Sequence, residues 1–217
     1  MNIILKFICG VIGGFLGYNI PYFSVRIMEY KKGKININSG KVLIGPTLSK
    51  VCFALFNAAA WLLCINNVDN GIAAVLISIQ ITLGLIIAFI DMNIRIIPNE
   101  LVLTVLILGI VFQTELNGIR GIIVSVISMI FIMIIFTAVA VIMGLGKVGA
   151  GDVKLAGAIG FALGYPLVVT AMATMSAILI LFIILGLVFR KIKMSTMLPL
   201  APFLVAGYIT ALISSTF

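Results

Sequence analysis

Long apolar runs separated by short polar breaks follow one another along the whole chain. The runs cover residues 3–22, 51–65, 72–90, 101–112, 121–143, 155–163, 167–189 and 198–213. A helix needs about 20 apolar residues to cross the hydrocarbon core of a bilayer, so spans built on the shorter runs must include flanking residues on one or both sides. Because a lipid-embedded backbone must satisfy its own hydrogen bonds, we predict an all-α, polytopic transmembrane helix bundle of about eight spans.

The composition agrees with this pattern and leaves no room for a separate soluble domain. Hydrophobic residues make up 63% of the chain and charged residues 9%, and the mean hydropathy is +1.35. A soluble domain does not carry such a composition. We predict two parts, namely a two-span unit with a basic cytoplasmic segment in residues 1–70 and a six-span unit in residues 71–217.

The basic residues indicate how the bundle is oriented. The net charge is +8, and in an eight-span arrangement only Lys6 and Arg120 fall on or near the second side. The others are Arg26, Lys31, Lys32, Lys34, Lys41, Lys50, Arg95, Lys147, Lys154, Arg190, Lys191 and Lys193. Basic loops mark the cytoplasmic face, so we predict that both termini lie outside. The charge then faces anionic membrane lipids, and no nucleic acid partner is expected.

Two of the six acidic residues stand out by position. Four have ordinary expected roles in polar turns, in an exposed ion pair or in the first turn of a helix after an N-capping Asn99. These four are Glu29, Asp69, Glu100 and Glu115. Asp91 and Asp152 remain, and both stand where an apolar run ends or begins, on the predicted cytoplasmic side.

A pair of nearby carboxylates has a recognised chemistry. Two close carboxyl groups do not both ionise easily, so one can act as a general base on water while the other protonates a leaving amine. That arrangement suits peptide hydrolysis. From charge alone, two unrelated interfacial aspartates that cap helix ends are an equally good interpretation. Histidine is absent and no CxxC pair occurs among the three cysteines, so no metal site and no disulfide framework are predicted.

Three sequence motifs favour the catalytic interpretation. The first places Asp91 seven positions before the proline of Ile97-Pro98-Asn99, and the second is Gly149-Ala150-Gly151-Asp152-Val153-Lys154-Leu155. Its glycines allow a tight turn and close approach of other groups. The third is Pro199-Leu200-Ala201-Pro202-Phe203-Leu204. Together these motifs, which span roughly residues 72–217, resemble the type IV prepilin peptidases, the GxGD membrane aspartic proteases. Ala201 stands where that family usually has glycine.

The resemblance implies an activity and its residues. Asp91 and Asp152 would be the catalytic pair of an integral membrane aspartic endopeptidase that uses no metal. The enzyme would remove the basic leader peptide of type IV prepilins and pseudopilins, in type IV pilus or type II secretion systems, at the cytoplasmic face of the bacterial inner membrane. The residues that match the supporting motifs are Pro98, Asn99, Gly149, Gly151, Lys154, Pro199 and Pro202.

The resemblance also implies a second activity in the N-terminal part. Bacterial family members methylate the new N-terminus with S-adenosylmethionine. Here Gly13-Gly14-Phe15-Leu16 resembles the family's Gly-Ser-Phe-Leu-Asn, and Phe15, Asn19 and Arg26 are candidates for the methyltransferase region. Many members carry two CxxC pairs in the first cytoplasmic segment. This chain has no CxxC pair, like variants of the family that lack these cysteines, and we expect methylation to be retained.

Two other readings remain open. A preflagellin-type peptidase would keep the aspartate pair without methyltransferase activity. A non-enzymatic, transporter-like protein would also explain paired acids in a membrane. It would, however, place them nearer the midplane, on broken helices in repeated halves, and the sequence shows neither feature. A purely structural membrane subunit would leave the motifs unexplained.

Overall fold

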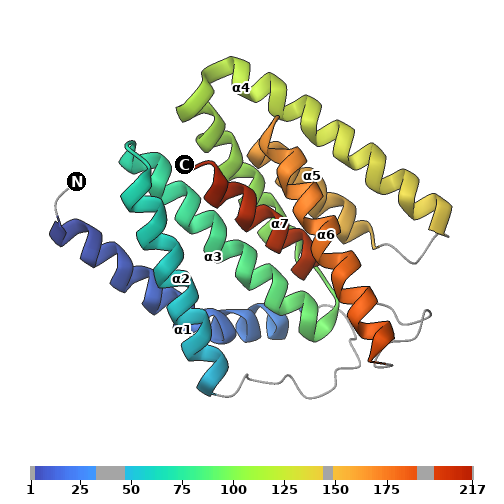
Figure 1. The fold of residues 1–217 in the computed structure, drawn as a ribbon, viewed down its shortest axis with the longest axis horizontal. Coiled ribbons are helices and arrows are strands. Elements are labelled where there is room, and N and C mark those ends of the chain that lie inside the picture. The colour runs from blue at the N-terminus through green and yellow to red at the C-terminus, as the bar shows by residue number, and fades with distance from the viewer. Residues whose placement is uncertain (1–2, 33–46, 144–148, 190–197, 217) are drawn as a thin grey trace.

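The chain forms a bundle of helices, as predicted (Figure 1). The computed structural model describes residues 3–32, 47–143, 149–189 and 198–216, and that part of the chain is all-α. The helices are α1 Ile3–Lys32, α2 Thr47–Asn67, α3 Gly71–Ile94, α4 Asn99–Met143, α5 Ala150–Leu163, α6 Leu167–Val188 and α7 Ala201–Ser214. Within the described ranges, 5 of these helices are long and apolar enough to cross a membrane.

The predicted loop at residues 113–120 is wrong, because α4 joins two apolar runs into one bent helix. The backbone leaves helical geometry at Gly118, with φ 60° and ψ −150°, and Figure 1 shows the bend. Gln113 explains why the segment before the bend stays helical. Its buried side chain donates a hydrogen bond to the Ala162 carbonyl of α5 at 2.9 Å and accepts one from Asn117 at 3.1 Å. The number of spans therefore stays a prediction.

The polar segment predicted at residues 26–50, between the first two apolar runs, is wrong at both ends, because α1 continues to Lys32 and α2 already begins at Thr47. Ile20 and Met28 lie on one face of this helix, are fully buried, and pack with Ile90 of α3. An apolar face with a packing partner keeps a segment helical even where its other positions are polar. Residues 33–46 of the predicted segment lie outside the described part of the chain.

Polar contacts gather at both ends of the bundle. Figure 1 shows the start of α1, the α2–α3 turn, the bend of α4 and the end of α7 at the same end. There Asn70, rather than Asp69, caps α3, and its Nδ2 donates to Glu115 at 3.2 Å. At the opposite end Lys31 pairs with Glu100 at 2.7 Å. In both contacts, the two partners are residues that the eight-span arrangement assigns to the same side of the membrane. Which end of the bundle faces the cytoplasm stays a prediction.

Close backbone approach holds α1 against α2. Lipid tails are as apolar as leucine, so membrane helices associate through small residues and buried hydrogen bonds. Both are present here. Gly13 and Gly17 face α2, and the buried Asn57 of α2 donates to the Gly13 carbonyl at 2.8 Å. Thr82 of α3 donates in turn to Asn57 at 3.1 Å. Because α1 and α2 both pack on α3, the division at residue 70 stays a prediction.

Two glycines of α1 provide a matched test of this packing. A Cβ at Gly17 would stand 2.5 Å from the Phe53 carbonyl oxygen, whereas one at Gly14 would stand 3.6 Å from its nearest neighbour, the Ala58 Cβ. We expect Gly17→Ala to lower the free energy of unfolding by about 1–3 kcal/mol. Gly14→Ala should be neutral or raise it by up to about 1 kcal/mol. Thermal unfolding in detergent measures both, and equal melting temperatures for the two variants would contradict the packing.

Candidate active site

Asp91 lies in the last turns of α3, and a contact from a distant helix holds it. Its side chain is 4% exposed, and its place near the negative C-terminal end of α3 is unfavourable for a carboxylate. The compensation comes from α7, where the Ala201 N–H donates to Asp91 Oδ2 at 3.1 Å. Leu200, the residue that precedes α7, makes no side-chain cap. Asp91 therefore serves as the N-terminal cap of α7, at the positive end of that helix.

Asp152 lies in the first turn of α5, because this helix begins at Ala150, before the apolar run predicted to start at residue 155. Its Oδ2 accepts the Gly149 N–H at 3.1 Å, which caps the start of α5. The side chain is half-buried and precedes the apolar part of the helix. Partial burial raises the pKa of Asp152 above its ordinary value, and the Gly149 N–H opposes this by stabilising the charged form.

The two glycines of this motif serve close approach rather than unusual backbone conformation. Gly149 has φ −71° and ψ 143°, which any residue adopts, so the tight turn expected from the sequence is wrong. A Cβ on Gly149 would stand 3.1 Å from Asp152 Oδ2, and one on Gly151 would stand 3.3 Å from the Ile97 Cβ. The glycines thus let α5 approach the α3–α4 connection and leave room for the carboxylate.

A side-chain contact ties α5 to the start of α4. Lys154 Nζ donates to Asn99 Oδ1 at 3.3 Å. The prediction that Asn99 caps α4 is wrong by one residue, because α4 begins at Asn99 and the Pro98 carbonyl accepts the first helical N–H groups. The Asn99 side chain is thereby available to Lys154, and the Asp91 and Asp152 motifs are joined directly.

The structure brings the three predicted motifs to one end of the bundle. Lys154 of the second motif contacts Asn99 of the first, and the Ala201 N–H of the third contacts Asp91 of the first. Pro202 stands in the first turn of α7, where a proline fits without loss of a helical hydrogen bond, and Pro199 precedes that turn. The hydrogen bond from Ala201 to Asp91 was not predicted from the sequence, because its donor is a backbone N–H and the type of side chain does not indicate it. The flanking prolines were the available signal.

The candidate methyltransferase residues lie on α1, and only one of them reaches the motifs. Phe15 is 66% exposed, and Asn19 donates to the Phe15 carbonyl of its own helix at 2.8 Å. Arg26 donates to the Tyr22 hydroxyl at 3.4 Å and lies over its ring. Arg26 also lines a pocket of about 240 Å³ with Ile27, Tyr30, Lys31, Pro98, Glu100 and Leu101. This pocket connects the end of α1 with the Pro98 motif.

Comparison with known proteins gives one match. The sequence profile of the type IV leader peptidase family matches residues 78–190, just over half of the 217-residue chain. The matched region contains Asp91, Asp152 and the contact between Lys154 and Asn99, while the start of α7 lies beyond it. Searches of curated proteins and of solved structures found no match.

The contact between Lys154 and Asn99 can be tested with a double-mutant cycle. We expect Lys154→Ala and Asn99→Ala each to lower the rate of peptide cleavage about fivefold, since a hydrogen bond contributes about 1 kcal/mol. The double variant should lose no more than either single variant, because the same link is removed. The measurement is kcat on a leader-peptide substrate. Losses that multiply in the double variant would show that the two residues act separately.

Proposed function

Since the chain belongs to the type IV leader peptidase family, we propose that Asp91 and Asp152 are its catalytic carboxylates. In this proposal the protein is a membrane aspartic endopeptidase that removes the basic leader peptide of type IV prepilins and pseudopilins. One observation supports it above the others. The Asp91 carboxylate is buried and fixed by the first N–H of α7, and the α5 motif that carries Asp152 contacts the Asp91 motif through Lys154 and Asn99.

The reaction needs one proton acceptor and one proton donor. The ionised carboxyl group takes a proton from water as its oxygen bonds to the scissile carbonyl carbon. The protonated carboxyl group gives its proton to the leaving nitrogen as the C–N bond breaks. Two carboxylates that interact favour the shared-proton state in which both roles are filled. The products are the leader with a new carboxyl group and a protein with a new N-terminal amine.

The two carboxyl groups lie in different surroundings. Asp91 is buried and hydrogen-bonded to the Ala201 N–H, whereas Asp152 is half-buried and hydrogen-bonded to the Gly149 N–H. Each carboxyl group keeps one oxygen fixed by a backbone donor, so its orientation is set before substrate arrives. Water approaches the pair from the Asp152 side, where the carboxyl group is accessible.

The charges around the pair support a cytoplasmic site in a bacterial inner membrane. Lys31 and Lys154 contact residues at the start of α4, and Arg95 ends the helix that carries Asp91. A basic end of a membrane bundle faces the cytoplasm. A basic leader is drawn to this end by anionic lipid headgroups and by the acidic pair. The position of both acids at a bundle end, rather than at mid-membrane, favours the peptidase over a transporter.

Methylation of the new N-terminus is a separate proposal that rests on the N-terminal helices α1 and α2. A preflagellin-type peptidase would lack this activity. The pocket beside Arg26 is about 240 Å³, below the ~300 Å³ at which small-molecule pockets begin, and Phe15 and Asn19 do not line it. The pocket that Arg26 lines is therefore too small to enclose S-adenosylmethionine by itself, and no step through this cofactor is derived.

The aspartate pair has a direct test with a control from the same chain. Asp91→Asn and Asp152→Asn remove the ability to exchange a proton, and each should lower cleavage of a prepilin by at least about 1,000-fold. Asp69→Asn, an exposed acid at the other end of the bundle, should change it by less than about twofold. Cleavage is followed by the mass of the product, with thermal unfolding as the check on folding. Substantial cleavage by either folded variant would reject the pair.

Methylation is decided by weighing the product. Purified protein is incubated with a prepilin and S-adenosylmethionine, and we expect the cleaved product to gain the mass of one methyl group. A known bifunctional relative, tested under the same conditions, serves as the control. A product that is cleaved but never methylated, where the relative methylates it, would leave this protein a peptidase only.

A further inference from the structure

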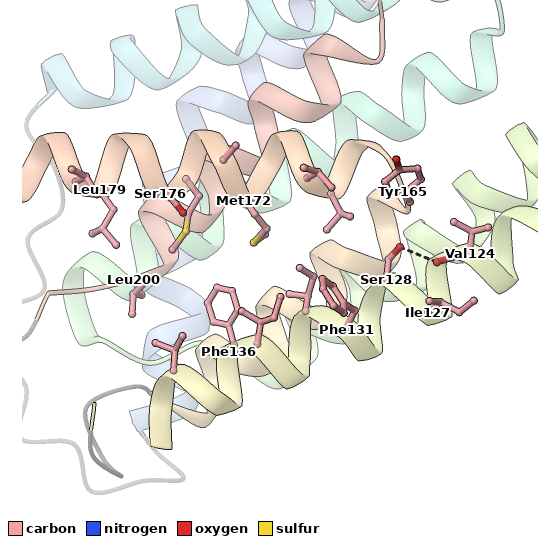
Figure 2. Close-up of a pocket in the computed structure, with 18 residues that line it drawn as sticks. Val124, Ile127, Ser128, Phe131, Phe136, Tyr165, Met172, Ser176, Leu179 and Leu200 are labelled. Atoms are coloured by element: carbon pink, nitrogen blue, oxygen red, sulfur yellow. Dashed lines mark hydrogen bonds between the residues drawn. The ribbon is translucent and has the colours of Figure 1, made fainter. Parts of the chain in front are cut away.

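A long apolar groove separates the second half of α4 from α6, and the peptidase motifs do not account for it. Figure 2 shows side chains from the two helices pointing toward one another across a gap. The groove has a volume of about 970 Å³, and its walls carry Phe131 and Ile135 from α4 and Met172 and Ser176 from α6. The two helices have almost no direct packing contact. Each packs on another neighbour instead, α4 on α5 and α6 on α7.

The groove has the dimensions of a helix that crosses a bilayer. Its lining on α4 runs from Val124 to Val139, which corresponds to about 22 Å along the helix axis. The hydrocarbon core of a bilayer is about 30 Å thick, so the groove extends through most of it. Both walls belong to candidate membrane spans. Any segment that fills it must therefore be apolar and must satisfy its backbone hydrogen bonds internally, which favours a helix.

One end of the groove adjoins the aspartate pair. Leu200 lines that end, opposite Tyr165 at the other end (Figure 2). Leu200 is followed directly by Ala201, whose N–H holds Asp91. A chain that leaves the groove at Leu200 therefore emerges beside Asp91, one of the two carboxylates proposed for catalysis. At the far end Tyr165 is 71% exposed, as expected for an aromatic residue at a membrane interface.

We propose that this groove binds an apolar helix of the substrate, namely the segment that enters the bilayer next to the scissile bond. The proposal rests on the proposed peptidase function and adds the location of the substrate helix and its direction. The helix lies between α4 and α6 with the end nearest the scissile bond at Leu200. The position of this helix in the groove sets which bond reaches Asp91 and Asp152. The groove therefore fixes the distance along the substrate between the membrane boundary and the bond that is cleaved.

The lining suits a helix whose exact sequence varies. Met172 is flexible and polarisable and adapts to different apolar partners. Ser128 and Ser176 are small and give room for close approach, and Ser128 satisfies its own hydroxyl by donating to the Val124 carbonyl at 2.9 Å (Figure 2). The binding surface is therefore mostly apolar, and its small residues leave room for another helix to approach closely.

Two adjacent small residues of α6 provide the first test. Ser176 lines the groove, whereas Ala177 is equally exposed and does not. We expect Ser176→Trp to fill the groove and raise KM about tenfold, with kcat within about twofold, for a prepilin-type substrate that carries an apolar helix beside the scissile bond. Ala177→Trp should change neither constant. A short leader peptide without the helix should be cleaved equally by both variants and by the wild-type protein.

Crosslinking tests the occupant independently of cleavage. Benzoylphenylalanine replaces Ile135, which lines the groove, or Ile134, which is exposed on another face of the same helix. Both proteins carry Asp152→Asn and are reconstituted in liposomes with the helix-bearing substrate. We expect light to crosslink position 135, and not position 134, to the apolar helix of the substrate. Crosslinks from position 135 to lipid alone, or to a second copy of this chain, would overturn the proposal.

The two experiments separate failure of the groove from failure of the proposed function. If the wild-type protein cleaves the substrate but Ser176→Trp leaves KM unchanged, the groove proposal is wrong and the peptidase assignment stands. If the wild-type protein cleaves no prepilin-type substrate, the proposed function is wrong. The crosslink from position 135 then still decides whether the groove binds an apolar helix.

Discussion

The hydrogen bond from the Ala201 N–H to the Asp91 carboxylate is the contact on which the rest of the site depends. An isolated carboxylate that is 4% exposed at the negative end of its own helix would be strongly destabilised. The positive end of α7 removes much of that penalty, and the carboxylate in turn satisfies an N–H that α7 cannot satisfy itself. One contact thus fixes the end of α3, the start of α7 and the position of the Asp91 carboxyl group.

The same contact explains why the third motif is rich in proline. Pro202 lies in the first turn of α7 and Pro199 precedes it, so the chain enters the helix with restricted backbone freedom. A rigid start of the helix keeps its first N–H groups in one orientation. The alanine at position 201 keeps the N–H that Asp91 needs, as the glycine usual in resembling sequences would.

The sequence carried the apolar pattern, and the helix bundle that this pattern predicts agrees with the structure, while the catalytic role of Asp91 and Asp152 stays a prediction. An all-α membrane bundle follows from 63% hydrophobic residues, and Asp91 and Asp152 were separable from the other acids by position. What the sequence did not carry were contacts between distant backbones. The contact of Ala201 with Asp91 joins residues 110 positions apart, and its donor is the same group in every residue except proline. The extension of α1 to Lys32 was missed for a related reason, because its apolar face is visible only once α3 supplies the partner for Met28.

The two aspartates stand on different packing units of the bundle. Asp91 belongs to α3, which packs along α7, whereas Asp152 belongs to α5, which packs along α4. Gly157 of α5 faces Met133 on the second half of α4, beyond the bend at Gly118. Membrane helices adjust their tilt to the thickness of the surrounding bilayer. A change in lipid chain length that altered the tilt of these units would change the separation of the two carboxyl groups proposed for catalysis, while each kept its own backbone donor.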